Sequence, residues 1–407
     1  MKTVFDGLDR PTLALLAREY LLCGHLIDRA GMPHVLAAGG IDAMREIAIE
    51  EWMGASPIYT RRVRRALDFE GDDVATIFKG MQIDIGAPPQ YMDFRFNVID
   101  AKHGEFQLAS CGALRDVEPM GDEYVVNMCH HIEDPTFDAT AAATNPKARM
   151  RPIHRPPRSP AGRVPNCHWT VEIDESVEAL SEPGAARRIG STRAAQHECP
   201  APDGEDSDGL TTYDGPLVAD IRFDDFSKNT LITLLQEISL QWHLLALSFF
   251  DATERRFGSD AAVEIATKQF TGIAGLTGMR LKRALKLGES LSDIAKLLDL
   301  HPAFHPRSYF SLQVDQADGL SVSLRDCPAI GDRPGRSWAE HLSNGASAPL
   351  DAIVRAVDRR ARCEEIGAPA GGLRAWNVLV DASPADESRE VRVTRISTGA
   401  EFSFEER

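Results

Sequence analysis

Cysteine and histidine side chains gather in one stretch of the sequence, between residues 103 and 168. In chain order they are His103, Cys111, Cys129, His130, His131, His154, Cys167 and His168. Thiolate and imidazole are preferred ligands of zinc and iron, and four of them can close a tetrahedral site. We expect a metal ion to be bound by Cys111, Cys129, His154 and Cys167. His130, His131 and His168 are then alternative ligands or groups that orient the ligands.

The number of protein ligands decides what such a site can do. A closed shell of three cysteines and one histidine is structural or holds an iron–sulfur cluster, whereas three protein ligands leave a position for water. We expect zinc, with iron or an iron–sulfur cluster as the alternative. An open zinc site lowers the pKa of its bound water and supplies hydroxide. Because the spacings are loose, the alternative is that these residues are buried free cysteines and surface histidines.

Polar residues that can assist hydrolysis flank the candidate ligands. Glu133 and Asp134 follow the Cys-His-His run and are candidates for the general base or for orienting a ligating histidine. An acidic run after a ligand turn is also typical of a solvated loop. Arg149, Arg151 and Arg155 lie in a basic, proline-containing stretch and can clamp a carboxylate or phosphate of a substrate. Alternatively, this stretch is a surface segment whose arginines balance local acids.

The elements that must position these residues are repeated within the chain. A shift of 218 positions aligns residues 12–67 with residues 230–285 without a gap. Of these 56 positions, 18 are identical, where chance gives about three or four. In both segments, apolar residues recur at helical spacing, and Ser227 is positioned to cap the start of the second segment. The repeat indicates an internal duplication.

Each helical segment is followed by an alternating pattern typical of a small antiparallel sheet. The expected strands are Tyr91–Asp100 and Glu105–Ser110 in the first unit, and Tyr309–Asp315 and Leu320–Arg325 in the second. We therefore predict an α+β fold of two homologous units, each a helical segment followed by a small antiparallel sheet. The units comprise residues 1–175 and 219–407. Residues 176–218 are rich in Ala, Gly, Ser and Pro, which is typical of a linker or long loop.

Comparison of the two units strengthens the prediction of a single site. The second unit retains Cys327 and Trp376 at positions that match Cys111 and Trp169 of the first. However, it has Arg374-Ala375 in place of Cys167-His168, and Ala361 in place of His154. Loss of candidate ligands from one copy, with retention of the scaffold, is what a single functional site in a duplicated protein predicts.

Two features recur in both units, and we interpret them as structural. His25 and its counterpart in the second unit lie on apolar helices, where we expect core histidines with satisfied hydrogen bonds. Basic runs that contain Arg62 and Arg280 also match between the units. We expect them to form structural ion pairs, for example with Glu46 or Glu264.

Composition narrows the class of protein and of partner. The chain has 407 residues and a formal charge of −16, which disfavours general nucleic-acid binding and an anionic membrane surface as partners. The longest apolar stretch, residues 238–250, is too short to span a bilayer. Seven scattered cysteines and no visible secretory signal favour a cytoplasmic protein. We expect a small-molecule substrate and leave a homo-oligomer open.

Most of both units resembles a known group of bacterial proteins. Residues 231–285, especially Glu254–Gly258 followed by Ala261–Ala266, resemble helical domains grouped near L-2-amino-thiazoline-4-carboxylic acid hydrolases. The sheet with Cys129, Pro156-Pro157 and Cys167-His168-Trp169 looks like that of bacterial relatives of the same layout. The resemblance implies a cysteine where this chain has His154, which is compatible with an exchange of ligand. The named hydrolases open a cyclic carbon–nitrogen bond.

Taken together, these features predict a metal-dependent hydrolase. Its substrate would be a small polar or acid-bearing metabolite, attacked by metal-activated water. The alternative is a non-catalytic binding or scaffold protein with a structural metal or iron–sulfur centre in the first unit. A third possibility is a metal-free small-molecule binding protein that uses a cavity between the helices.

Overall fold

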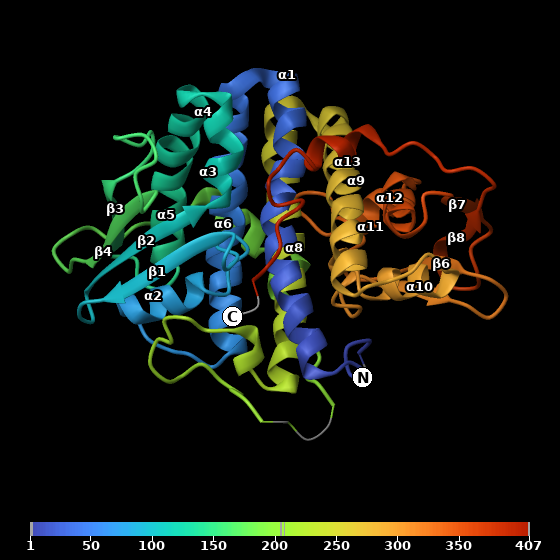
Figure 1. The fold of residues 1–407 in the computed structure, drawn as a ribbon, viewed down its shortest axis with the longest axis horizontal. Coiled ribbons are helices and arrows are strands. Elements are labelled where there is room, and N and C mark those ends of the chain that lie inside the picture. Colours follow the sequence, from blue (N-terminus) through green and yellow to red (C-terminus); the bar gives the residue numbers. More distant parts are fainter. Residues whose placement is uncertain (1–2, 204–205, 207, 406–407) are drawn as a thin grey trace.

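Three long helices form the centre of the molecule. The computed structural model describes residues 3–203, 206 and 208–405. Helix α1 (Arg10–Ala66) packs along α8 (Lys228–Phe257) and α9 (Ser259–Ala284), and a smaller α+β part lies on each side of them (Figure 1). Asp9 caps the start of α1, and Ser227 caps α8 as the sequence predicts. Among the described residues, no helix is both long and apolar enough to cross a membrane.

A glycine in each unit produces the same change of direction between two helices. Gly40 interrupts α1 with φ 76° and ψ −174°, and Gly258 separates α8 from α9 with φ 85° and ψ 167°. Side chains with a Cβ rarely adopt such positive φ values, so glycine is required at both positions. Because Gly40 and Gly258 are equivalent in the repeat, the backbone supports the 218-residue shift.

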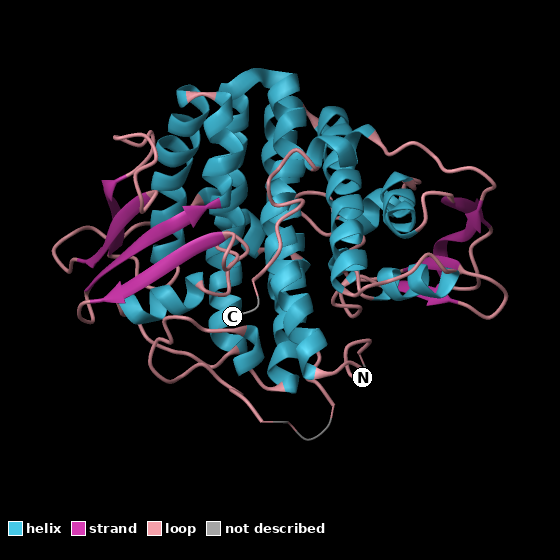
Figure 2. Cartoon of the chain, viewed as in Figure 1, coloured by secondary structure: helices cyan, strands magenta, loops and turns pink. Residues whose placement is uncertain are grey.

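Each unit contains one antiparallel sheet of the same topology, as the sequence predicts (Figure 2). The first comprises β1 (Met92–Val98), β2 (His103–Cys111), β3 (Ala148–His154) and β4 (Cys167–Ile173), in the order β1-β2-β4-β3. The second comprises β5 (Leu312–Asp315), β6 (Ser321–Arg325), β7 (Ala361–Ile366) and β8 (Gly372–Val380), in the order β5-β6-β8-β7. The α+β fold of two similar units is thus confirmed.

Shorter helices cover the sheets and connect the units. In the first unit they are α2 (Val74–Met81), α3 (Gly112–Val117), η1 (Glu118–Met120), α4 (Asp122–Val126), η2 (Asn127–Ile132) and α5 (Glu133–Ala142). The connection contains α6 (Gly184–Gly190), α7 (Arg193–Gln196) and η3 (Phe223–Asp225). The second unit has α10 (Leu291–Asp299), η4 (Pro302–Phe304), α11 (Trp338–Ser343), α12 (Ala348–Val357) and α13 (Arg389–Thr394). Helix η2 is a π-helical turn, and such turns are frequent at functional sites.

Two reciprocal buried ion pairs join the units. Arg62 of the first unit donates to both carboxylate oxygens of Glu237 at 2.8 and 2.9 Å. Arg280 of the second donates in the same way to Glu19 at 2.7 and 3.1 Å. The expected partners Glu46 and Glu264 instead form exposed pairs with Arg256 and Lys268. That expectation is therefore wrong in detail, because the arginines pair across the interface between the units.

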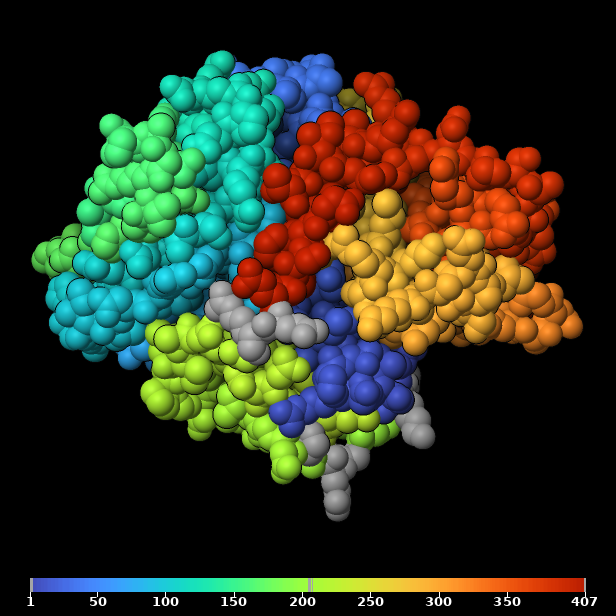
Figure 3. Space-filling view, viewed as in Figure 1, coloured from blue at the N-terminus to red at the C-terminus, as the bar shows by residue number. Residues whose placement is uncertain are grey.

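Each unit also sends a segment across to the other. We call residues 184–197 the first arm and residues 389–402 the second arm. Backbone amides of the first arm donate to Asp332 of the second unit at 2.7 and 2.9 Å, and that of Thr398 in the second arm donates to Asp116 of the first at 2.7 Å. Figure 3 shows the second arm, in red, lying on the surface between the two units. The first arm lies within the segment expected as a linker or long loop.

Candidate functional site

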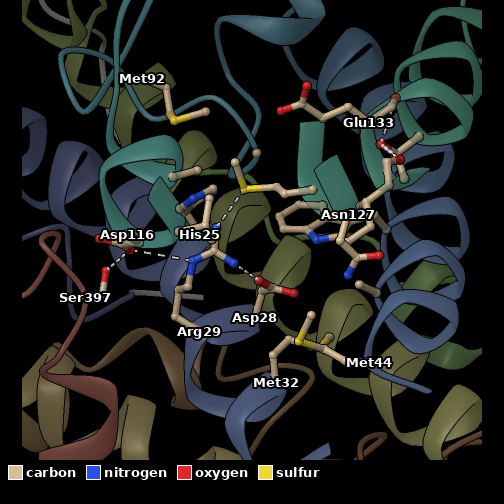
Figure 4. A pocket seen from close by; sticks show the side chains of 18 of the residues that line it. His25, Asp28, Arg29, Met32, Met44, Met92, Asp116, Asn127, Glu133 and Ser397 are labelled. Carbon is tan, nitrogen blue, oxygen red and sulfur yellow. Dashed lines mark hydrogen bonds and ion pairs between the residues drawn. The ribbon is translucent and has the colours of Figure 1, made fainter. Parts of the chain in front are cut away.

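A cavity of about 400 Å³ lies inside the first unit. Its walls come from α1, the start of the first sheet, the helical stretch from α3 to α5, and the second arm. Figure 4 shows side chains of α1 facing Asn127 of η2 and Glu133 of α5 across this space. Segments far apart in the sequence therefore build one site, and the second unit contributes part of its wall.

Methionines give the cavity an adaptable apolar wall. Six of the ten methionines in the chain line it, namely Met32, Met44, Met81, Met92, Met120 and Met128. Trp52, Phe94 and Phe137 add aromatic surface. Methionine is unbranched and polarisable, so a surface rich in it adjusts to the shape of a bound molecule. Such a wall is typical of a binding site for an organic molecule.

His25 points into this cavity and is not the satisfied core histidine that the sequence led us to expect. Among the described residues, neither of its ring nitrogens has a hydrogen-bond partner of normal geometry, although the Ile85 backbone lies close enough to interact with the ring. Its counterpart His243 does have one, since its Nε2 lies 2.9 Å from the carbonyl oxygen of His305. Burial, helped by the nearby Arg29 charge, lowers the pKa of His25 to about 3. The imidazole is therefore neutral at physiological pH and can both donate and accept a hydrogen bond.

Arg29 and the carboxyl groups of Asp28 and Asp116 line the cavity together with His25. Arg29 contacts Asp28 at 2.5 Å and Asp116 at 3.6 Å (Figure 4). Burial raises the pKa of Asp28, and burial together with Asp28 raises the pKa of the neighbouring Glu51 well above its usual range. Glu51 therefore favours its protonated form, whereas the Arg29 charge opposes the effect of burial on the pKa of Asp28. No described residue forms a hydrogen bond of normal geometry with Oδ1 of Asp28, although the Trp52 and Glu51 side chains lie close enough to interact with this carboxyl.

The opposite wall carries two more unpaired polar groups. Asn127 is 3% exposed, and no described residue forms a hydrogen bond with either of its amide atoms. Oε2 of Glu133 is likewise shielded from solvent and unpaired. Burial raises the pKa of Glu133 to about 8, so this carboxyl is largely protonated at pH 7. Of the two predicted catalytic acids, Glu133 lies at the cavity, whereas Asp134 forms an ion pair with Arg155.

Three of the four predicted metal ligands come together behind Glu133. Cys111, Cys129 and Cys167 are all buried, and their thiols lie close enough to influence one another and Glu133. Burial, with a further contribution from Glu133, raises the pKa of Cys111 to about 12. Its sulfur also accepts a hydrogen bond from the Leu114 amide at 3.3 Å and so caps α3.

The structure does not bring the fourth predicted ligand, His154, to these thiols. Unbroken pairing of β3 with β4, as in Pro152 with Trp169, would place His154 opposite Cys167. A bulge after Pro152 shifts the register by one residue, so His154 pairs with His168 instead. Successive residues face opposite sides of a sheet, and His154 therefore lies on the face away from Cys167. As placed, the four residues do not form the expected tetrahedral shell, and we derive no chemistry from a metal here.

His130, His168 and the predicted substrate-binding arginines have protein partners outside the cavity. His130 bonds the Pro156 carbonyl at 2.7 Å, His168 bonds Glu105 at 3.1 Å, and His131 is exposed. Arg149 donates to the carbonyl oxygens of Pro146 and Glu178, Arg151 pairs with Asp138 at 2.9 Å, and Arg155 pairs with Asp134. None of these side chains lines the cavity. Within the described residues, no three His, Cys, Asp or Glu side chains are arranged to hold a metal ion.

Metal binding has a direct test that does not depend on activity. If zinc or iron is bound as predicted, protein purified without added metal should contain about one ion per chain. Both Cys129→Ala and Cys167→Ala should then lose it, as measured by elemental analysis. Stable wild-type and variant proteins that are all free of metal would show that the prediction is wrong.

The second unit has no comparable polar array at the equivalent positions. Asp28, Arg29 and Glu51 correspond to Ala246, Leu247 and Gln269. Phe270, which replaces Trp52, stacks on Trp338 with ring centroids 4.6 Å apart, and His243 packs against the same indole. The polar set of the first unit is therefore not needed for the shared scaffold. The repeat alignment already contained this signal at positions 28, 29 and 51.

Comparison with protein-family models, with curated proteins and with solved structures gives no match for this chain. The resemblance to thiazoline-carboxylate hydrolases therefore stays a prediction. Because a fold can host many functions, function has to be argued from the geometry of the site.

Proposed function

We propose that the first unit binds a small organic molecule in the cavity between α1 and α5. The observation that carries this proposal is the set of unpaired polar atoms of His25, Asp28, Asn127 and Glu133 around an otherwise apolar space. Each buried polar group left without a partner costs about 1–3 kcal/mol. A ligand that supplies the missing partners recovers much of this free energy on binding.

The ligand would have an apolar body and at least one polar group. The methionine-rich wall suits the body, because these side chains adapt to an irregular outline without polar contacts. A cavity of about 400 Å³ lies within the range of small-molecule sites. Val393 and Ile396 of the second arm complete the wall, so ligand binding involves both units.

A second candidate function is general acid–base catalysis on the bound molecule, of which hydrolysis is one instance. The observation that favours it is Glu133, whose pKa is raised to about 8, at the cavity wall opposite Asp28, which pairs with Arg29. A carboxyl with its pKa near the working pH can donate a proton, and a carboxylate nearby can accept one. Glu133→Gln keeps the shape of the side chain but cannot donate that proton. It should abolish turnover and retain binding if Glu133 is the acid.

Binding can be tested with a library of small compounds and thermal unfolding. A true ligand at about 100 times its dissociation constant should stabilise the protein by about 2.7 kcal/mol. Ala48, which lines the cavity and is 3% exposed, offers a blocking position. We expect Ala48→Phe to remove the response by filling the space, while Glu46→Phe on the exposed face of the same helix retains it. A ligand that stabilises Ala48→Phe as strongly as the wild type does not bind in the cavity.

A further inference from the structure

The unpaired atoms at the cavity include several hydrogen-bond acceptors, together with donors on Arg29, Asn127 and His25. Oδ1 of Asp28 and Oε2 of Glu133 are carboxyl oxygens, and Asn127 and His25 each add one acceptor. Asn127 and His25 are 3% and 6% exposed, so solvent does not replace the missing partners. A ligand that satisfies the acceptors of this set must bring several donors to a small region. An ammonium group carries up to three donors on one atom.

The charges around the cavity also favour a positive ligand. Arg29 is the one cationic side chain of the described wall, and both Asp28 and Asp116 already pair with it. Its Nη2 faces only the Met128 sulfur at 3.6 Å, a weak acceptor. An incoming carboxylate would therefore meet a guanidinium that two carboxylates already neutralise.

The other acidic residues of the cavity wall, Asp84 and Asp116, already accept hydrogen bonds from protein donors. They therefore do not need a donor from the ligand. Asp84 accepts hydrogen bonds from the Tyr59 hydroxyl at 2.7 Å and from the Gly86 amide at 2.6 Å. Asp116 accepts from Tyr91, Ser397 and Thr398. The open carboxyl positions are therefore those of Asp28 and Glu133, together with Glu51, which adjoins Asp28.

The apolar wall is compatible with a cation attached to an aromatic or aliphatic body. Trp52, Phe94 and Phe137 present aromatic surface, whose faces attract positive charge. The repeat adds an independent argument, because the second unit keeps the histidine as His243 but has the neutral Ala246, Leu247 and Gln269 in place of the three charged or acidic positions. The charged set thus accompanies the cavity and not the shared helical scaffold.

We infer that the cavity binds an organic amine, with its ammonium group between Asp28 and the Asn127–Glu133 wall and its apolar body among the methionines. This inference rests on the proposed function and adds the chemical class of the ligand. It differs from the acid-bearing substrate that the sequence predicts.

Three probes with the same ring system test the charge preference directly. They are 1-naphthylmethylamine, 1-naphthylmethanol and 1-naphthoic acid, with binding to the full-length protein measured by calorimetry at pH 7. We expect the amine to bind about tenfold or more tightly than the alcohol, and the acid to bind most weakly. Asp28→Asn should reduce affinity for the amine by about tenfold and leave affinity for the alcohol unchanged within about twofold. Asp42→Asn, on an exposed part of α1, should change neither.

The outcomes separate this inference from the proposed function. Equal binding of amine and alcohol, or preferential binding of the acid, would overturn the amine assignment and still support a small-molecule site, provided that Ala48→Phe removes it. No binding of any probe would overturn the amine assignment, and the compound library would then decide the proposed function. If Asp28→Asn is not folded by circular dichroism, Asn127→Leu replaces it. That variant should weaken the amine more than the alcohol.

Discussion

Replacing Asp28, Arg29 and Glu51 together by Ala, Leu and Gln should raise the free energy of unfolding by about 1–4 kcal/mol and abolish ligand binding. These are the residues at the equivalent positions of the second unit. Burial of the three side chains carries a desolvation cost, and their mutual contacts leave Oδ1 of Asp28 and both carboxyl oxygens of Glu51 without partners of normal geometry in the described structure. Exchange of a buried ionic group for packed apolar residues is often stabilising for this reason.

Chemical denaturation and the naphthyl probes would measure both effects in the same samples. The reverse substitution, Ala246→Asp in the second unit, is the matched control. It places an unpaired carboxylate at a site that is 4% exposed, so we expect it to destabilise the protein strongly. A triple variant that is less stable than the wild type would show that the charged set supports the fold. In that case its retention could not be ascribed to a ligand.

Arg280→Met should lower the free energy of unfolding by about 3–5 kcal/mol. The substitution leaves Glu19 buried beside an apolar side chain, and burial already raises the pKa of this carboxyl even with Arg280 present. It also removes the donor to the carbonyl oxygens of Gly399 and Ala400, which anchors the second arm. We therefore expect the arm to be cleaved first in limited proteolysis.

The double variant Glu19→Gln with Arg280→Met should recover part of the loss, because it no longer buries an unpaired charge. Arg62→Met is the matched substitution on the other side of the interface, where Arg62 donates to Glu237 and to the Ala195 carbonyl. It should cost a similar amount but leave the second arm resistant to protease. Equal protease sensitivity of the second arm in both variants would contradict the assigned anchor.

The fold could be predicted from the sequence because its signals are local or repeated. The 218-residue shift, the cap at Ser227 and the alternating strands each depend on neighbouring residues or on direct comparison of two segments. The site depended on tertiary facts that spacing does not contain. Asn127 and the second arm reach the same cavity although some 270 residues separate them in the chain. Likewise, the apolar helix around His25 predicts a core residue, whereas the structure places His25 at the cavity wall.

His154 illustrates how one residue of register changes a predicted site. With regular pairing, it would lie opposite Cys167 and the predicted ligand set would share one face of the sheet. The bulge after Pro152 moves it to the other face; a proline within a strand is compatible with a bulge but also with a regular edge strand, so it does not fix the register. The sequence predicts Glu133 as a catalytic acid beside a metal ion, whereas the structure places it at an apolar cavity. Its role there stays a prediction.

The reciprocal ion pairs and crossed arms are the contacts of a two-fold symmetric dimer held within one chain. In a dimer of identical subunits, any substitution that filled one cavity would fill both. A single chain removes that constraint, because positions 28 and 246 are encoded separately. One unit can then be optimised for packing while the other keeps a costly polar interior. The stability supplied by the second unit thus allows the first to remain open.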